Sequence, residues 1–382
     1  MDKIRRKNAQ KVVVAMSGGV DSSVAAALLK GAGFDVMGIF MKFWAEPKKS
    51  ESAGFNRCCS LEAERRARKV AKILKIPFYV FNFEKEFKKK IVDYFLAEYK
   101  KGQTPNPCVT CNKEIKFGLL LEKALRLDAD FVATGHYARL WQENPKSKNQ
   151  NPKIRLLNAN DKEKDQSYFL WQLNQKQLKH ILFPAGDYTK SEVRNLAKKF
   201  KLPVLKARKS VEICFIQTTI NDFLARHLKQ EPGKINYSSP DVEQQIIGQH
   251  RGLWFYTIGQ RKGIGLAGGP YYVLDKDLKK NLLIVTKKEK DLYKKELQVR
   301  NVNWISGNVP KLPLIVKAKI RYRHKAATAI ISRRLKSKVY SLKFKVAQRA
   351  ITPGQSVVFY SPAEVSTKAG KGQELLAGGI IC

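Results

Sequence analysis

A glycine- and serine-rich turn is the first segment whose residue types could do chemistry, Ala15-Met16-Ser17-Gly18-Gly19-Val20-Asp21-Ser22-Ser23. Its two glycines let the backbone turn tightly and direct amide N–H groups at an anion, and its serines add hydroxyl donors at a helix N-terminus. The turn matches neither the Walker pattern nor the dinucleotide fingerprint. Asp21 would repel a phosphate unless a Mg²⁺ ion bridged the two. The turn therefore predicts a nucleotide site, with a simple helix cap as the alternative.

The cysteines offer a second kind of chemistry. Cys108 and Cys111 form a C-x-x-C spacing, and Cys214 follows far along the chain, so only folding could bring these thiols together. Six cysteines with such spacing are too few for the disulfide framework of a secreted protein, which favours reduced, reactive or metal-bound thiols. Structural zinc is disfavoured because a four-thiolate site needs a second C-x-x-C. The other cysteines are given no role: Cys58, Cys59 and Cys382.

The elements that would position these residues alternate along the first two hundred or so residues. Apolar runs rich in β-branched residues predict strands at 11–16, 34–43, 76–83 and 130–136. Stretches with helical periodicity predict helices at 24–33, 61–75, 84–100, 114–127 and 189–200. Strict alternation of strand and helix favours a parallel sheet covered by helices on both faces. The glycine-rich turn follows the first strand of this sheet, which strengthens its interpretation as a nucleotide site.

The pattern changes after Leu202-Pro203. Residues 204–275 combine a short helical piece with glycine-rich turns, and short strands separated by turns follow from about residue 282. Many short, evenly spaced strands are typical of a small antiparallel barrel or sandwich. The polar stretch 142–152 is expected to be a surface loop. We therefore predict an α/β protein with three domains: a Rossmann-like catalytic domain at 1–205, a central β-rich domain at 206–278 and a C-terminal antiparallel β-barrel at 279–382.

Composition limits the classes of protein that this chain can be. Its 382 residues include 73 Lys and Arg against 33 Asp and Glu, a formal charge of +40, and 43% are hydrophobic. This apolar content excludes a disordered tail protein, and 24 Gly with 15 Pro exclude a collagen-like chain. The charge predicts a polyanionic partner, nucleic acid first, with a lysine bias of the whole proteome as the alternative. Because there is no long apolar stretch and no signal-peptide pattern, we expect no membrane contact and a cytoplasmic location.

SGGVDSS after an apolar strand resembles the PP-loop of the ATP pyrophosphatases, a superfamily that includes argininosuccinate, GMP and NAD synthetases and several tRNA-modifying enzymes. Further segments choose among these members. In order along the whole chain, apart from 142–152, they resemble the tRNA-specific 2-thiouridylases. The matching segments are GIFMK (38–42), CCS (58–60), TPNPCVTCNKEIKFG (104–118), ATGHYAR (133–139), KDQSYFLWQL (164–173), EICFI (212–216), YTIGQRKGIG (256–265), KIRYRH (319–324), TPGQSVVFY (352–360) and AGGII (377–381).

The resemblance implies a reaction. ATP with Mg²⁺ would adenylate the carbon-2 oxygen of the wobble uridine in the anticodon arm of tRNA, and a protein persulfide would then replace that oxygen with sulfur. The products would be 2-thiouridine, AMP and pyrophosphate. Cys214 matches the persulfide-bearing cysteine of the family, and Cys111 matches the catalytic cysteine that releases the sulfur. A cysteine desulfurase or a sulfur-relay protein would supply the sulfur, and the wobble base would leave its stack to reach the site.

Cys108 departs from the family pattern. Some members carry an aspartate there that is thought to assist thiol deprotonation. This sequence leaves three candidates for that role: Lys113, a nearby cluster of backbone amides, or Cys108 itself. It also leaves a rival mechanism open, because Cys108, Cys111 and Cys214 could hold three corners of an iron–sulfur cluster with one position free for sulfur transfer.

The resemblance also assigns binding residues. Those for ATP are Ala15, Met16, Ser17, Gly18, Gly19, Val20, Asp21, Ser22, Met41 and Gly135. Those for tRNA are Asn106, Pro107, Cys108, His136, Lys164, Asp165, Gln166, Arg321, Tyr322 and Gln355. Some have a plain structural alternative: Met41 as a core residue, His136 as a structural histidine, and 164–166 as a solvated helix start.

Two other functions fit these residues. A PP-loop enzyme that acts on a small molecule would release pyrophosphate without tRNA, whereas a 2-thiouridylase would need tRNA for that release. A basic RNA-binding protein with an inactive nucleotide loop would bind RNA with a steep salt dependence but would make no AMP.

Overall fold

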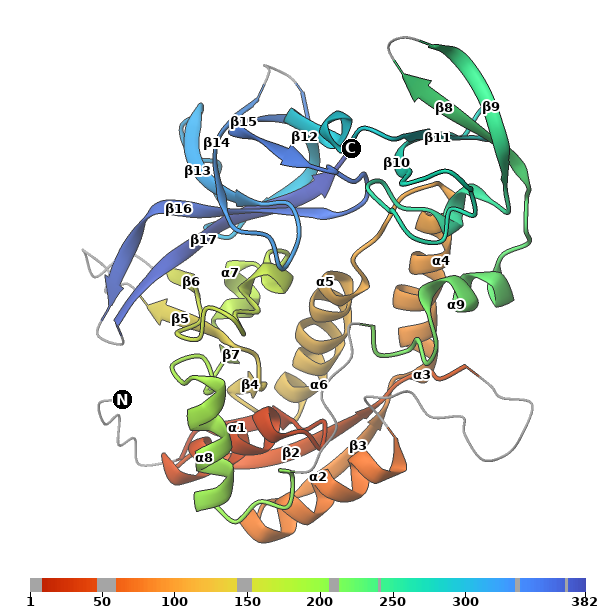
Figure 1. Ribbon diagram of the computed structural model, residues 1–382. Coiled ribbons are helices and arrows are strands. Elements are labelled where there is room, and N and C mark those ends of the chain that lie inside the picture. Colours follow the sequence, from red (N-terminus) through yellow and green to blue (C-terminus); the bar gives the residue numbers. More distant parts are fainter. Residues whose placement is uncertain are drawn as a thin grey trace.

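The computed structural model describes residues 9–46, 60–142, 153–205, 213–239, 242–333, 337–367 and 370–382. Figure 1 shows a parallel sheet with its helices at one end of the molecule and two β-rich parts at the other. This arrangement agrees with the fold class predicted from the sequence. Within the described residues, no helix is both long and apolar enough to span a bilayer.

The first sheet is parallel throughout and has the strand order β3-β2-β1-β4-β7. Its strands are β1 (Lys11–Ala15), β2 (Asp35–Lys42), β3 (Phe78–Asn82), β4 (Phe131–Ala133) and β7 (Ile181–Leu182). The central strand β1 carries three consecutive valines with at most 1% of their surface exposed. An unbroken buried run of this kind is typical of a parallel strand that is covered on both faces. The short β7 carries too few residues for a sequence signal.

Two long helices rise from this sheet, and each contains π-helical turns in its middle. One is α3 (Glu84–Phe87), η1 (Lys88–Val92) and α4 (Asp93–Lys100), and the other is α5 (Pro107–Cys111), η2 (Asn112–Leu119) and α6 (Leu120–Arg126). The second begins seven residues before the predicted start at 114, because Pro107 takes the first helical position, where its missing N–H costs nothing. In Figure 1, α4 and α5 stand between the sheet and the β-rich parts.

The remaining helices are shorter. They are α1 (Val20–Gly31), α2 (Leu61–Leu74), η3 (Ser167–Leu170), α7 (Gln175–Leu178), α8 (Lys190–Lys199), α9 (Ile220–His227), η4 (Leu253–Phe255) and η5 (Glu289–Leu292). Helix α1 packs against both α2 and α8. It therefore joins the glycine-rich turn to elements from the far end of the predicted catalytic domain.

The β-rich part of the chain forms two bodies. The central sheet has the order β10-β11-β8-β9 and comprises β8 (Gly233–Ser239), β9 (Val242–His250), β10 (Tyr272–Asp277) and β11 (Leu282–Thr286). The barrel comprises β12 (Tyr293–Trp304), β13 (Leu314–Lys319), β14 (Ala327–Arg333), β15 (Tyr340–Arg349), β16 (Ser356–Thr367) and β17 (Gly370–Ile381). Strand β12 pairs with β15 on one side and β17 on the other, which closes the barrel.

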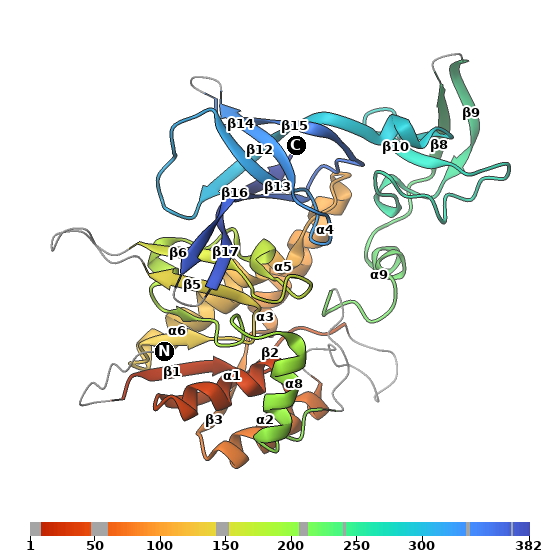
Figure 2. The same cartoon turned by 60° about the vertical axis from the view of Figure 1, so that its left-hand side comes forward.

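A hairpin from the first half of the chain extends the barrel sheet. Strands β5 (Ala138–Gln142) and β6 (Ile154–Asn158) pair with each other, and β6 also pairs with β17 (Figure 2). Arg155 forms an ion pair with Glu374 at 3.2 Å across this join. Residues 143–152 of the predicted surface loop lie outside the described residues, but the loop is flanked by paired strands. The proposed domain boundaries at 205 and 278 stay predictions.

Candidate functional site

The glycine-rich turn links the carboxyl end of β1 to α1 and is held tightly from behind. Gly18 has a φ of +71°, and a Cβ there would lie 2.1 Å from the carbonyl oxygen of Ala63 at the start of α2. Only glycine fits this position, because the turn lies directly against α2. The Ser17 N–H donates to Ser22 Oγ at 3.2 Å, and Ser23 Oγ donates to the carbonyl oxygen of Gly19 at 2.8 Å. These hydrogen bonds hold the turn in one conformation directly before the N-terminus of α1, a place where anions bind in other proteins.

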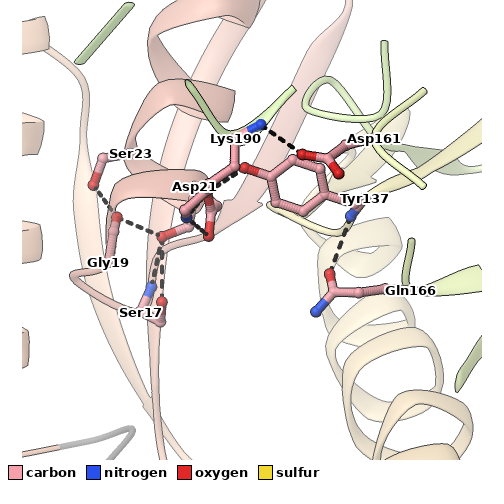
Figure 3. A network of polar contacts seen from close by, with 9 residues as sticks. Ser17, Gly19, Asp21, Ser23, Tyr137, Asp161, Gln166 and Lys190 are labelled. Atoms are coloured by element: carbon pink, nitrogen blue, oxygen red, sulfur yellow. Dashed lines mark hydrogen bonds and ion pairs between the residues drawn. The ribbon is translucent and has the colours of Figure 1, made fainter. Parts of the chain in front are cut away.

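Asp21 in this turn is already paired with a cation. Lys190 Nζ donates to the two carboxylate oxygens at 2.6 and 2.8 Å, and the Tyr137 hydroxyl donates to Oδ1 at 2.7 Å. Burial, followed by the charge of Asp21, raises the pKa of Tyr137, so its hydroxyl remains a donor. Figure 3 shows this network, with Asp161 and Gln166 on the side of Tyr137 away from the turn.

Lys190 is a candidate functional residue that the sequence interpretation missed. It is the first residue of α8, whose cap Thr189 forms a capping box with Glu192. A lysine in the first turn of a helix lies at the positive end of the dipole, where a cation is disfavoured. Such a lysine signals an anionic partner, and here that partner is Asp21 beside the expected phosphate site. The position of Lys190 in a first helical turn can be read from the sequence, but its partner Asp21 cannot.

Met41 lies in β2 and Gly135 just after β4, and these two strands flank β1. A Cβ on Gly135 would lie 2.6 Å from the backbone nitrogen of Ser22, so Gly135 allows the first turn of α1 to approach the end of β4. Met41 is half-buried, is the next-to-last residue of β2 and packs against the apolar core. Both residues therefore lie beside the glycine-rich turn, and their contacts with adenosine stay predictions.

His136 is a buried structural histidine in this structure. Its Nδ1 lies 2.6 Å from the Thr134 hydroxyl, and its Nε2 lies 3.4 Å from Lys116 Nζ. Phe117 and Phe183 pack against the ring. Burial, followed by the charge of Lys116, lowers the pKa of His136 well below 6.5, so the ring is neutral. Both ring nitrogens face groups inside the protein, and the tRNA contact assigned to His136 stays a prediction.

Cys111 lies beyond the carboxyl edge of the parallel sheet. The helix that contains it, formed by α5, η2 and α6, directly precedes β4 in the chain. The helix therefore lies antiparallel to that strand. Lys116 of the helix already contacts His136, which follows the carboxyl end of β4. Cys111 precedes Lys116 by about 7 Å along the helix axis. The thiol thus lies on the same side of the sheet as the glycine-rich turn, where sites of α/β proteins form.

Cys214 reaches the same side through aromatic packing. Its neighbour Phe215 lies edge-on to Phe87 and Phe95, at ring-centre distances of 5.9 and 5.4 Å. These two rings flank η1, and α5 packs against η1 as well. The two cysteine-bearing segments therefore pack on the same two turns of one helix. Cys111 is buried in this structure, and Cys214 is half-buried.

The segment of Cys214 is also anchored by α9. Arg226 donates to both carboxylate oxygens of Glu46 at 2.7 Å, and His227 Nε2 lies 3.0 Å from the same carboxylate. The Arg226 hydrogen bond holds the pKa of Glu46 below its usual range. Glu46 follows β2, so this ion pair fixes α9 beside the carboxyl edge of the sheet. Cys58 and Cys59 lie outside the described residues.

The helix made of α5, η2 and α6, which we term the cysteine helix, starts at Asn106, Pro107 and Cys108. Asn106 is its half-buried N-cap residue, Pro107 is buried at the first position, and Cys108 is half-buried in the first turn. Asn106 interacts with the hydroxyl of the buried Tyr168. The positive end of the helix dipole favours a negative charge on this turn. These residues and Cys111 are brought together as predicted, whereas their contact with RNA stays a prediction.

The segment 164–166 divides between surface and core. Lys164 is exposed, but only 5% of Asp165 is exposed, and its carboxylate accepts from the backbone of Ala159 and from Ser167. Gln166 pairs through its Oε1 with the backbone nitrogen of Tyr137 at 3.0 Å. The Asp165 carboxylate holds this loop together, and the tRNA contact assigned to Asp165 stays a prediction. Lys164 stays available to a ligand.

The predicted tRNA residues of the barrel lie at its junction with the other parts. Arg321 donates to the carbonyl oxygen of Ala350 and to the Thr352 hydroxyl, each at 2.8 Å. Tyr322 packs on Phe169 with 4.5 Å between ring centres. Gln355 Nε2 donates to the carbonyl oxygen of Thr104 at 2.9 Å. The structure thus brings these residues near the N-terminal end of the cysteine helix, where they hold neighbouring elements together.

The three thiols do not form a ready metal site. Among the residues that the structure describes, no three His, Cys, Asp or Glu side chains lie close enough together to hold a metal ion. The predicted set of Cys108, Cys111 and Cys214 as iron–sulfur ligands does not fit this arrangement, and we derive no step through a cluster. For Mg²⁺, Asp21 offers the one carboxylate that suffices when ATP phosphates supply further ligands. Lys190 would have to release it.

Three family models match consecutive parts of the chain. The tRNA methyl transferase HUP domain matches residues 10–218, the tRNA methyl transferase PRC-barrel domain residues 221–287 and the aminomethyltransferase beta-barrel domain residues 294–381. The tRNA-specific 2-thiouridylase MnmA 2 of Thermoanaerobacter sp. (strain X514) is 49% identical over 357 residues, which cover 92% of this chain and 94% of that protein. The chain belongs to the tRNA-specific 2-thiouridylase family.

Other 2-thiouridylases agree. The MnmA 1 protein of Caldanaerobacter subterraneus subsp. tengcongensis is 48% identical over 97% of both chains, and the MnmA protein of Clostridium perfringens is 44% identical over 97% of this chain and 98% of its own. The resemblance predicted from the motifs is therefore confirmed. Among solved structures, a 4-thiouridine synthetase–RNA complex with bound ATP aligns at 16% identity and a TM-score of 0.36, covering 57% of this chain and 50% of that one. This likeness is too distant to support an inference.

Proposed function

We propose that this protein is a tRNA 2-thiouridylase that adenylates the carbon-2 oxygen of the wobble uridine and replaces it with sulfur from a persulfide on Cys214. Membership of the 2-thiouridylase family makes the chain a tRNA sulfurtransferase by class. The adenylation and persulfide steps are our proposal. The observation that carries it is the shared location of the glycine-rich turn, α5 and the Cys214 segment at one edge of the parallel sheet.

The first step takes place at the glycine-rich turn. The amides and serine hydroxyls there hold the phosphates of ATP, while the uracil oxygen attacks the α-phosphorus and pyrophosphate leaves. Mg²⁺ that arrives with ATP neutralises charge on the phosphates. Lys190, displaced from Asp21 by the incoming phosphates, remains close enough to stabilise the pyrophosphate as it leaves.

The second step takes place at the thiols. The terminal sulfur of the Cys214 persulfide attacks carbon 2 of the uracil, and AMP leaves with the original oxygen. The Cys111 thiolate then attacks the Cys214 sulfur, which breaks the sulfur–sulfur bond, leaves sulfur on the base and forms a Cys111–Cys214 disulfide. An external thiol reduces this disulfide, and a cysteine desulfurase or sulfur-relay protein reloads Cys214.

Cys108 occupies the position from which an acidic residue would act in some relatives. In this protein we propose that the first turn of α5 itself assists the reaction. Its positive dipole favours negative charge near Cys108 and the uracil that approaches Asn106 and Pro107. Lys113 pairs with Glu114 at 3.6 Å on the exposed side of the helix, which makes it the weaker of the remaining candidates.

Binding of tRNA is proposed to involve the central sheet and the barrel. The net charge of +40 suits a polyanionic substrate and predicts affinity that falls steeply with salt. The predicted contacts include Lys164, Arg321, Tyr322 and Gln355. The last three lie at the junction of the barrel with the cysteine helix. Their location suits them to hold the anticodon arm with its wobble base above α5.

The proposal is tested with purified protein, ATP, Mg²⁺, unmodified tRNA, and a cysteine desulfurase with its cysteine substrate, which delivers sulfur at the persulfide level. We expect 2-thiouridine in the digested tRNA by mass spectrometry, together with AMP and pyrophosphate whose release requires tRNA. Release of pyrophosphate without tRNA would favour an enzyme for small molecules. Salt-sensitive RNA binding with no AMP would favour a binding protein.

A further inference from the structure

Three residues between α4 and the cysteine helix are held by groups from both β-rich parts of the chain. This segment, Gly102-Gln103-Thr104, which we term the strap, connects the end of α4 to Pro105 and α5. In both overall views, the end of α4 lies between the barrel and the central sheet (Figures 1 and 2). The strap is therefore the place where all three parts of the molecule meet.

The central sheet holds the first residue of the strap. Lys276 of β10 donates through Nζ to the carbonyl oxygen of Gly102, and also to that of Tyr256 at 3.1 Å. The side chain of Leu278 lies over Gly102, so a Cβ there would be only 2.7 Å from it. Burial lowers the pKa of Lys276 to about 8, which marks how far its ammonium is removed from water.

The barrel holds the other two residues. Arg300 of β12 donates to Gln103 Oε1 at 2.9 Å. The Thr104 N–H donates to the carbonyl oxygen of Pro353 at 2.9 Å, and Gln355 Nε2 donates back to the Thr104 carbonyl oxygen at 2.9 Å. Each residue of the strap is thus fixed by a hydrogen bond from outside the parallel α/β part.

The junction contains a buried polar group that the contacts above do not satisfy. The Thr104 hydroxyl is buried without a hydrogen-bond partner, whereas such groups are normally paired inside proteins. Beside the strap, a pocket of about 130 Å³ that is partly open to solvent is lined by strap residues together with Ile258, Lys276 and Pro353.

A displacement of the strap would also displace the start of the cysteine helix. Pro105 and Pro107 are both buried, and each fixes its own φ angle. The chain between Thr104 and the first turn of α5 is therefore short and stiff. A shift of the central sheet or the barrel would be transmitted through Lys276 and Arg300 to the start of α5, and so to the place of Cys111.

We propose that Lys276 and Arg300 are positioning residues, which couple binding of RNA on the β-rich parts to the placement of Cys111 through the strap. This inference rests on the proposed function for the identity of the RNA, which is tRNA. It adds a role for two residues that do not touch the reacting atoms.

The first test is the single-turnover rate of thiolation at saturating ATP and tRNA. We expect Lys276→Met to lower this rate about tenfold, the effect of losing one charge-assisted hydrogen bond, while the tRNA dissociation constant changes by less than about twofold. Lys276→Arg should restore much of the rate, because the guanidinium keeps the positive charge and the hydrogen-bond donors. Lys279→Met, an exposed lysine in the following turn, is the matched control and should behave as wild type.

The second test does not depend on thiolation. The rate at which iodoacetamide alkylates Cys111 is measured by peptide mass spectrometry with and without tRNA. We expect tRNA to change this rate about fivefold in wild type, the lower end of usual coupling between sites, and to leave it almost unchanged in Lys276→Met. Arg300→Gln tests the barrel side in the same way and covers the case that Lys276→Met fails to fold.

Equal responses of Cys111 to tRNA in wild type and both variants would overturn the coupling. So would a Lys276→Met protein whose saturated turnover matches wild type. A wild-type protein that binds tRNA but never thiolates it would instead overturn the proposed function, and the alkylation measurement would still report on the strap.

Discussion

The glycine-rich turn and the thiol pair lie at the same edge of one sheet but are assembled in different ways. The turn is shaped by its own residues, and Asp21 already has both Lys190 and Tyr137 as partners. The thiols come from two distant segments, and α5 and Phe215 pack on the same helix. The nucleotide end is thus pre-organised, whereas the sulfur end depends on tertiary packing.

Because the turn and the thiols are assembled separately, we expect substitutions to affect the proposed adenylation and sulfur-transfer steps separately. Substitutions at the turn should affect ATP affinity and adenylation, and they should leave the thiols intact. Substitutions at the thiols should leave ATP binding intact and stop sulfur transfer. The predictions below test this separation, beginning with the largest expected effect.

Replacing either thiol should abolish sulfur transfer. We expect Cys214→Ser and Cys111→Ser each to lower 2-thiouridine formation by about a thousandfold or more, because a hydroxyl can neither carry nor release the sulfur. ATP affinity, measured by calorimetry, should remain at the wild-type value. Cys382→Ser, at the exposed end of β17, is the control and should be fully active. Thiolation at the normal rate by Cys214→Ser would contradict its persulfide role.

Removing the cation at Asp21 should impair the nucleotide step. Lys190→Met leaves the Asp21 carboxylate without its ion pair beside incoming phosphates, and we expect tRNA-dependent AMP formation to fall about a hundredfold. Alkylation of Cys111 should be unaffected. Lys198→Met, near the other end of α8, should behave as wild type. If Lys190→Met makes AMP normally, Lys190 is only a structural partner of Asp21.

Crowding the turn from behind should have a smaller effect on the same step. A methyl group at Gly135 would lie 2.6 Å from the Ser22 nitrogen and push the first turn of α1 away, so Gly135→Ala should weaken ATP binding about tenfold. Gly31→Ala at the other end of α1 meets no atom within 4 Å and serves as the control. Equal ATP affinities for the two variants would show that the turn tolerates displacement.

The smallest effect concerns acid stability. Burial holds the folded pKa of His136 well below 6.5, so the unfolded chain takes up a proton near pH 6.5 that the folded protein refuses. His136 therefore contributes nothing to the pH dependence of the free energy of unfolding above pH 6.5. Below pH 6.5 it lowers that free energy by about 1.4 kcal/mol per pH unit. The melting temperature of His136→Asn should fall less between pH 7 and 5.5 than that of wild type. Parallel pH profiles would show that His136 titrates normally in the folded state.

Local signals predicted most of the fold correctly. The strands and helices of the first two hundred or so residues are visible because burial on two faces or on one helical face leaves a pattern in consecutive residues. The join between β6 and β17 was missed because its partners lie more than two hundred residues apart. No periodicity within a segment reveals such a partner.

The candidate site was predicted less completely, for the same physical reason. The glycine-rich turn and Cys108 through Cys111 carry their chemistry in adjacent residues. The burial of Asp165 and His136 depends on elements that pack around them, so a motif alone could not tell an RNA contact from a core residue. Lys190 escaped notice because Asp21, its partner, lies 169 residues earlier.

The central claim is that Cys111 and Cys214 act on one sulfur atom. Protein that carries a persulfide on Cys214 is mixed with ATP, Mg²⁺ and tRNA without reductant, and its cysteine peptides are mapped by mass spectrometry after one turnover. We predict one Cys111–Cys214 disulfide for each 2-thiouridine formed. Formation of 2-thiouridine with Cys111 still reduced would contradict the account.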